Sequence, residues 1–183
     1  MQRLARIVQG EPAPAWRIVR TMTSDGMDAL STMLEAPLIS LDLETDRVES
    51  WQVGAKIKSL CITADGKTVA AAHQEDPTFV AVLTKLQAYL ETPGKSVVGS
   101  NVSFDLEWLE RDLEFQVKCQ GIHDVALWWY EAGQYKQPSL KQLVSEQLDG
   151  YRHLVHQPHL TQDVERLLAY NAEDVIYPLQ LLR

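Results

Sequence analysis

The sequence predicts an α/β protein in which a mixed β-sheet is flanked by helices. Short apolar runs at residues 38–44 and 95–99 have the length and composition of buried strands. The dipeptide Asp65-Gly66 separates two further apolar segments, as expected in a β-hairpin. Apolar residues also recur at helical spacing between these segments, so strands and helices alternate along the 183-residue chain.

The first elements are a strand and a short helix. Residues 1–15 contain two prolines and are expected to form an extended lead-in, followed by one domain over residues 16–183. Residues 16–22 alternate as a strand does. Ser24 is expected to cap a helix that ends before Pro37.

Residues 38–44 are predicted to form a central strand that delivers two carboxylates at its C-terminal end. Asp42 and Glu44 are two residues apart, so on a strand they point to the same face. The next two strands, residues 57–64 and 67–72, flank Asp65-Gly66, for which we expect a two-residue turn with positive φ at both positions. These three strands form the antiparallel part of the predicted sheet.

The middle of the chain is predicted to continue as helix, strand and helix. Asp76-Pro77 has the order of a cap followed by a first helical proline. The buried stripe of this helix is expected to contain Phe79, Val80, Leu83, Leu86 and Leu90. A buried strand over residues 95–99 then precedes a helix over residues 102–113, which carries Asp105.

Three helices are predicted in the last third of the chain. They cover residues 125–131, residues 139–148 and the segment from about residue 161 to the end. Ser139 and Gln142 have the spacing of a capping box. Tyr170 and Asp174 are four residues apart and therefore share a face of the last helix, which Pro178 is expected to kink or end early.

The composition restricts the class of protein. No apolar run reaches the roughly 18 residues of a membrane span, and the first residues lack a secretory signal, so we expect a cytoplasmic protein without a membrane partner.

The net charge bears on the binding of nucleic acid. The 17 basic and 25 acidic residues give a net charge of −8. Such a charge disfavours simple phosphate neutralisation, but carboxylates that bind divalent cations would themselves be acidic, and the cations then attract a phosphodiester.

Four carboxylates on separate elements predict a metal site. Hard cations such as Mg²⁺ or Mn²⁺ prefer oxygen ligands, and two cations roughly 3.5–4 Å apart can activate water and stabilise a phosphodiester during hydrolysis. The candidate ligands are Asp42, Glu44, Asp105 and Asp174. A fold that brings these elements together would form a site for two divalent cations.

Three short motifs contain the four carboxylates and Tyr170, namely residues 41–45 (LDLET), 99–105 (GSNVSFD) and 170–174 (YNAED). They resemble, in this order, the first, second and third motifs of DnaQ-like 3′–5′ exonucleases. Their order and spacing, within a resemblance that covers roughly residues 16–183, are those of the tyrosine-bearing branch. This branch includes the proofreading domain of DNA polymerase I and ribonuclease D. In the histidine branch the corresponding base stands one position earlier, where this chain has Ala169.

The resemblance implies a ribonuclease H-like fold, with the antiparallel strands followed by parallel ones, and a role for each motif residue. Asp42, Glu44 and Asp174 would hold the cation on the nucleophile side, and Asp42 and Asp105 the cation on the leaving-group side. Tyr170, whose ordinary pKa is near 10, would orient the attacking water rather than remove its proton.

Other residues in or near the motifs are candidates for substrate contact. Leu43 and Thr45 would meet the terminal nucleotide, while Asn101 and Phe104 serve either substrate contact or turn geometry and packing. Lys141 is a candidate for a phosphate contact or a solvated side chain. His123-Asp124 resembles a further Asp-Thr element of the family, although Val125 stands where threonine is usual.

The expected activity is removal of nucleoside 5′-monophosphates from the 3′ end of single-stranded or frayed DNA. The enzyme would act alone or with a separate or fused DNA polymerase. Two alternatives remain, namely an exoribonuclease similar to ribonuclease D and a catalytically silent binding module of the same fold. The presence of all four acids and the tyrosine argues against the silent module.

Overall fold

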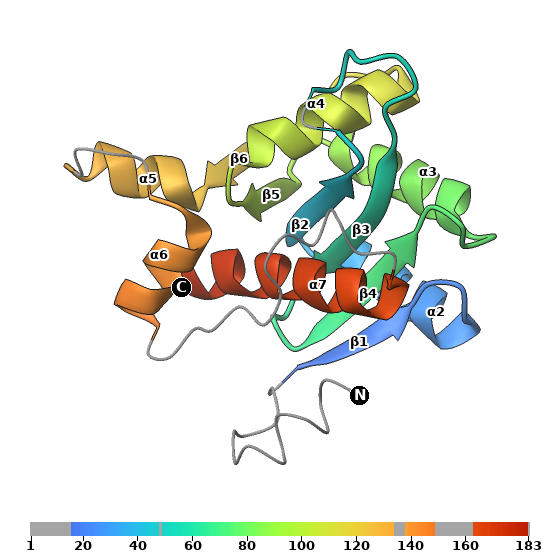
Figure 1. The fold of residues 1–183 in the computed structure, drawn as a ribbon, viewed down its shortest axis with the longest axis horizontal. Coiled ribbons are helices and arrows are strands. Elements are labelled where there is room, and N and C mark those ends of the chain that lie inside the picture. The colour runs from blue at the N-terminus through green and yellow to red at the C-terminus, as the bar shows by residue number, and fades with distance from the viewer. Residues whose placement is uncertain (1–15, 48, 134–137, 149–162, 183) are drawn as a thin grey trace.

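The computed structural model describes residues 16–47, 49–133, 138–148 and 163–182. The predicted lead-in over residues 1–15 therefore lies outside the described residues. A six-stranded sheet forms the centre of the described molecule, with helices on both of its faces (Figure 1). The strands are β1 (Arg17–Arg20), β2 (Leu38–Thr45), β3 (Ile57–Thr63), β4 (Thr68–His73), β5 (Ser96–Gly99) and β6 (Gly121–Asp124).

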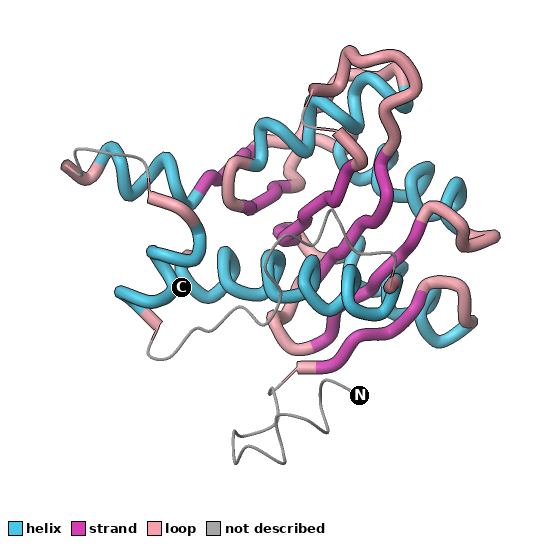
Figure 2. Tube along the Cα trace, in the orientation of Figure 1, coloured by secondary structure: helices cyan, strands magenta, loops and turns pink. Residues whose placement is uncertain are grey.

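The strand order is β1-β4-β3-β2-β5-β6, which confirms the predicted mixed sheet. Strands β2, β3 and β4 pair antiparallel, whereas β5 lies parallel to β2 and β6 parallel to β5. Strand β1 adds a parallel edge next to β4. Strand β2 thus lies inside the sheet, where its side chains can be buried on both faces (Figure 2).

Three helices cover one face of the sheet, and one long helix covers the other. Helices α2 (Ser24–Glu35), α3 (Phe79–Leu90) and α4 (Val102–Leu113) pack on the face that contains Ile39, Leu41 and Leu43. Helix α7 (Val164–Leu181) crosses the opposite face and contacts β2, β3, β4 and β5 (Figure 1). Helices α5 (Val125–Glu131) and α6 (Leu140–Gln147) follow β6, and α6 packs against α7.

Two helix starts differ from the prediction. The cap of α2 is Thr23 rather than Ser24, because the Thr23 side chain accepts a hydrogen bond from the N–H of Gly26. Helix α3 begins at Phe79, and Asp76 does not cap it. The Asp76 carboxylate instead accepts from the backbone N–H of His73 and from Arg20, so tertiary partners have replaced the expected local one.

Several side-chain and turn predictions also need correction. Val80 is 74% exposed, and Val82 and Tyr89 occupy the buried stripe of α3 in its place. The hairpin exists, but in its turn only Gly66 has a positive φ, of 70°. Asp65 stabilises the turn differently, since its carboxylate accepts from the N–H groups of Lys67 and Thr68.

Helix α7 continues through Pro178 to Leu181, so the expected early end is wrong. A proline in a helix cannot donate to the carbonyl four residues before it, here that of Asp174, and costs about 3 kcal/mol. Burial of this end of α7 offsets the cost, because Leu179 is 2% exposed and packs with β5, α5 and α6.

Only one half of the predicted capping box is present at the start of α6. Ser139 accepts a hydrogen bond from the Gln142 N–H, whereas the Gln142 side chain donates to Glu146.

The helices of the described residues include no segment long and apolar enough to cross a membrane.

Candidate active site

Strand β2 places two carboxylates on the sheet face that α7 covers. Its odd-numbered residues Ile39, Leu41 and Leu43 are buried in the core under α2, α3 and α4. Because side chains alternate along a strand, Asp42 and Glu44 point to the other face, where both remain partly exposed. The alternation predicted from the sequence is therefore present.

Helix α4 brings Asp105 to the same strand. Strand β2 pairs with β5 only as far as Ser40, which leaves the C-terminal half of β2 without a strand on that side. One carboxylate oxygen of Asp105 takes this place and accepts from the N–H of Leu43 at 2.8 Å. Asp105 is 3% exposed, so this hydrogen bond fixes a buried carboxylate next to Leu43, which lies between Asp42 and Glu44.

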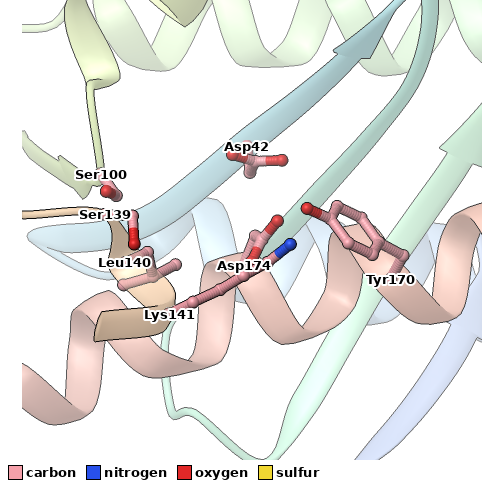
Figure 3. Close-up of a pocket in the computed structure, with 7 residues that line it drawn as sticks. All are labelled: Asp42, Ser100, Ser139, Leu140, Lys141, Tyr170 and Asp174. Atoms are coloured by element: carbon pink, nitrogen blue, oxygen red, sulfur yellow. The ribbon is translucent and has the colours of Figure 1, made fainter. Parts of the chain in front are cut away.

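Helix α7 adds Asp174 and Tyr170 on the same face of the sheet. Oxygen atoms of Asp42, Glu44 and Asp174 all lie within 4.8 Å of one another. The Tyr170 hydroxyl is hydrogen-bonded to the Asp174 side chain. Figure 3 shows this hydroxyl and the carboxylates of Asp42 and Asp174 directed into the same space. The Asp105 carboxylate is not part of this three-oxygen group, although it is close enough to affect Asp42 electrostatically.

The carboxylates disfavour one another's ionised forms. Burial, followed by the charges of Asp105, Asp174 and Glu44, raises the pKa of Asp42 well above its ordinary value. Burial also raises the pKa of Asp105, against the opposing effect of its bond from Leu43. The protein therefore concentrates negative charge where solvent screens it poorly.

The donor set fits divalent cations. Hard cations prefer carboxylate oxygens, and a cation relieves the repulsion that raises the pKa of Asp42. Asp42, Glu44 and Asp174 would hold one cation between them. The site accordingly suits Mg²⁺ or Mn²⁺.

Burial raises the pKa of Tyr170, and the neighbouring charges of Asp174, Glu44 and Asp42 raise it further. The phenol consequently keeps its proton throughout the neutral range. Tyr170 can donate a hydrogen bond in this site but cannot serve as a base.

The cluster opens into a pocket of about 250 Å³ between β2, α6 and α7 (Figure 3). Its described lining consists of Asp42, Ser100, Ser139, Leu140, Lys141, Tyr170 and Asp174. Ser100 and Leu140 were not predicted as lining residues, and Ser139 was predicted to cap a helix. The position of the first turn of α6 beside β2 depends on tertiary packing, which local residue patterns do not determine. Lys141 was predicted to make a phosphate contact or to be a solvated side chain, and the structure places it in the pocket lining.

The four expected substrate contacts lie outside this pocket lining. Leu43 is 5% exposed with its side chain in the opposite core, so only its backbone faces the site. The Thr45 hydroxyl donates to the carbonyl of Arg47. Asn101 has a φ of 60° before α4, and the Phe104 ring packs 6.1 Å from that of Trp108. Turn geometry and packing thus account for Asn101 and Phe104, and substrate contact by all four stays a prediction.

Asp124 has a structural role. Its carboxylate accepts from the N–H groups of Ala126 and Leu127 at the start of α5. It also accepts from the N–H of Val102 at the start of α4. Asp124 therefore joins the two helices that follow β5 and β6.

Comparison with known proteins identifies a sequence family and a group of similar folds. The sequence matches the family model described as 3′–5′ exonuclease over residues 18–183. No curated protein matches the chain in sequence.

Solved structures share the fold at low sequence identity. RNase D from Escherichia coli is 19% identical with a TM-score of 0.69, and the match covers 91% of this chain and 43% of that one. Trypanosoma brucei RNase D in complex with RNA U12 is 15% identical with a TM-score of 0.72, covering 91% and 61%. Brucella melitensis NrnC with bound Mg²⁺ is 19% identical with a TM-score of 0.62, covering 91% and 77%.

Proposed function

Because the chain belongs to the 3′–5′ exonuclease family, we propose that it removes nucleotides one at a time from the 3′ end of DNA. The products are nucleoside 5′-monophosphates, and the activity is of the proofreading type. The observation that carries this proposal is the group of three carboxylates from β2 and α7 with Tyr170 beside it. A DNA polymerase, either fused or separate, is the partner we propose for this activity.

Two divalent cations complete the proposed site. Asp42, Glu44 and Asp174 would hold one of them, and Asp42 and Asp105 would hold the other. When bound, such cations make water a stronger nucleophile and stabilise the charge that develops at the phosphate and the leaving oxygen.

The protein's own side chains orient the reactants. Tyr170 keeps its proton because burial and the carboxylates raise its pKa. Its hydroxyl, which contacts the Asp174 side chain, therefore positions the attacking water or a phosphate oxygen as a hydrogen-bonding group and not as a base. Asp105, held by the N–H of Leu43, keeps a carboxylate at the open edge of β2, close to Asp42. Pre-positioned groups of this kind lower the entropic part of the barrier.

A second candidate function is removal of nucleotides from the 3′ end of RNA. The similarity to an RNase D structure that contains RNA supports it. The described pocket lining contains two serines, Ser100 and Ser139, but no group that distinguishes ribose from deoxyribose by its chemistry alone. DNA and RNA therefore have to be compared directly.

The test is degradation of matched DNA and RNA oligonucleotides labelled at the 5′ end, with Mg²⁺ or Mn²⁺. A product ladder that shortens from the 3′ end, and that a chelator abolishes, is expected on at least one substrate. Asp42→Ala should abolish the ladder, whereas Asp28→Asn, an exposed position on α2 across the sheet, should leave it unchanged. Absence of a ladder with either metal and either substrate would refute the proposed activity.

A further inference from the structure

Lys141 alone is cationic among the described residues that line the pocket. It lies in the first turn of α6, opposite the carboxylates of β2 and α7. Its ammonium nitrogen lies 5.4 Å from the centroid of the Tyr170 ring (Figure 3). Among the described lining residues, a single positive charge therefore stands beside groups that are otherwise neutral or acidic.

Within the described parts of the chain, the Lys141 ammonium forms no ion pair and no hydrogen bond, and its contact is with the face of Tyr170. Lys95, by contrast, has a structural role, because its ammonium donates hydrogen bonds to the carbonyls of Leu34, Glu35 and Ala36. A lysine ammonium can donate three hydrogen bonds. The pocket thus leaves the donors of Lys141 available to a bound molecule.

We propose that Lys141 binds a non-bridging phosphate oxygen of the terminal nucleotide and holds that phosphate against the carboxylate side of the pocket. This inference rests on the proposed exonuclease function. The carboxylates, which would hold the cations, form one wall, and Lys141 belongs to the wall formed by α6, so a phosphate bound in the pocket can contact both. Lysine serves there as a compact point charge. A pocket of about 250 Å³ suits one terminal nucleotide better than a longer segment.

A purely electrostatic role for Lys141 predicts different behaviour. If the lysine only offset the charge of Asp42 and Asp174, its removal would tighten cation binding. At saturating cation, affinity for a nucleotide would then be unchanged. If Lys141 contacts the phosphate, its removal should instead weaken nucleotide binding, and added cation should not restore the lost affinity.

The experiment compares the wild type with Lys141→Met, Lys141→Arg and the control Lys85→Met. Lys85 is exposed on α3, on the far face of the sheet, and its replacement makes the same change in net charge. Binding of AMP, dAMP and adenosine is measured at saturating Mn²⁺. KM and kcat are measured on the labelled oligonucleotides, and the Mn²⁺ affinity of each variant is measured separately.

We expect Lys141→Met to weaken binding of AMP and dAMP, and to raise KM, by roughly 10- to 100-fold, the effect of losing a hydrogen bond to a charged group. Binding of adenosine, which has no phosphate, should change little. Lys141→Arg should restore much of the nucleotide affinity, and Lys85→Met should match the wild type. Equal loss for adenosine and AMP, or wild-type nucleotide affinity in Lys141→Met, would overturn the assignment.

The two proposals fail in distinguishable ways. If the wild type degrades oligonucleotides and Lys141→Met has unchanged KM and nucleotide affinity, the role of Lys141 is refuted and the exonuclease stands. If the wild type degrades nothing but binds AMP or dAMP in a manner that depends on Lys141, the activity is refuted and the phosphate contact stands. If the wild type neither degrades nor binds, both are refuted.

Discussion

Replacing Asp42 with asparagine should stabilise the metal-free protein while destroying its activity. Asp42 shares its site with Glu44 and Asp174, whose oxygens lie within 4.8 Å. At that separation two unit charges repel by about 3.5 kcal/mol for an effective dielectric constant near 20. Because the protein relieves part of this repulsion by binding protons, we expect a gain of about 1–3 kcal/mol from Asp42→Asn.

The size of this gain in stability depends on pH. The folded-state pKa of Asp42 is raised above its unfolded value, so between these two values the folded protein binds more protons than the unfolded one. Stability of the metal-free wild type therefore falls as pH rises from about 4 through the raised pKa. The advantage of Asp42→Asn should be present at pH 8 and shrink towards pH 5.

Thermal unfolding measures this directly. At about 2–4 °C per kcal/mol for a chain of this size, Asp42→Asn should raise Tm by roughly 2–12 °C at pH 8 in a chelator. Saturating Mn²⁺, at about 100 times its Kd, should stabilise the wild type by about 2.7 kcal/mol and the variant much less. Asp28→Asn, exposed on α2, controls for loss of one negative charge.

Two results would contradict the reasoning. A lower Tm for Asp42→Asn than for the wild type at pH 8 without metal would show that the Asp42 carboxylate is stabilising rather than repelled. An equal Mn²⁺-induced rise in both proteins would show that Asp42 is not a ligand.

Three further predictions concern single side chains. Tyr170→Phe should lower kcat by roughly 100-fold with little change in Mn²⁺ affinity, because the variant lacks the hydroxyl that positions the reactants. Because the pKa of Tyr170 is raised, ionisation of the phenol should cause no loss of wild-type activity below about pH 10 in a pH–rate profile. Trp108→Ala should cost about 3–5 kcal/mol in chemical denaturation because Trp108 is 0% exposed, whereas Trp51→Ala, at a residue 73% exposed, should fall within about 0.5 kcal/mol of the wild type. Thr23→Ala should cost about 1 kcal/mol by loss of the α2 cap, and Ser24→Ala should cost much less; the opposite order would mean that Ser24 is the cap.

Local sequence patterns predicted the elements that carry the carboxylates. Strand β2 was predictable because apolar residues alternate with Asp42 and Glu44. In a strand this alternation directs the apolar side chains to one face of the sheet and the two carboxylates to the other. The four-residue spacing of Tyr170 and Asp174 on α7 follows equally from helix geometry. In both cases the information lies within a few residues of the chain.

Features that depend on distant partners were missed. Strand β6 (Gly121–Asp124) has no apolar run, and it exists because β5 provides a parallel edge for it. Asp76 looked like a helix cap, but Arg20, 56 residues away, and the N–H of His73 hold its carboxylate. The wall of the pocket formed by Ser139, Leu140 and Lys141 likewise depends on α6 packing against α7.

The stability of the fold and the repulsion in the site are linked through β2. The same strand buries Ile39, Leu41 and Leu43 in the core of one face and presents Asp42 and Glu44 on the other. The carboxylates cannot move apart to relieve their repulsion without displacing that core, and Asp105 is held to the backbone of Leu43. Cation binding relieves the repulsion without such movement. A rigid sheet thus keeps the carboxylates of the proposed metal site close together in the metal-free protein, at a cost in stability that a bound cation would offset.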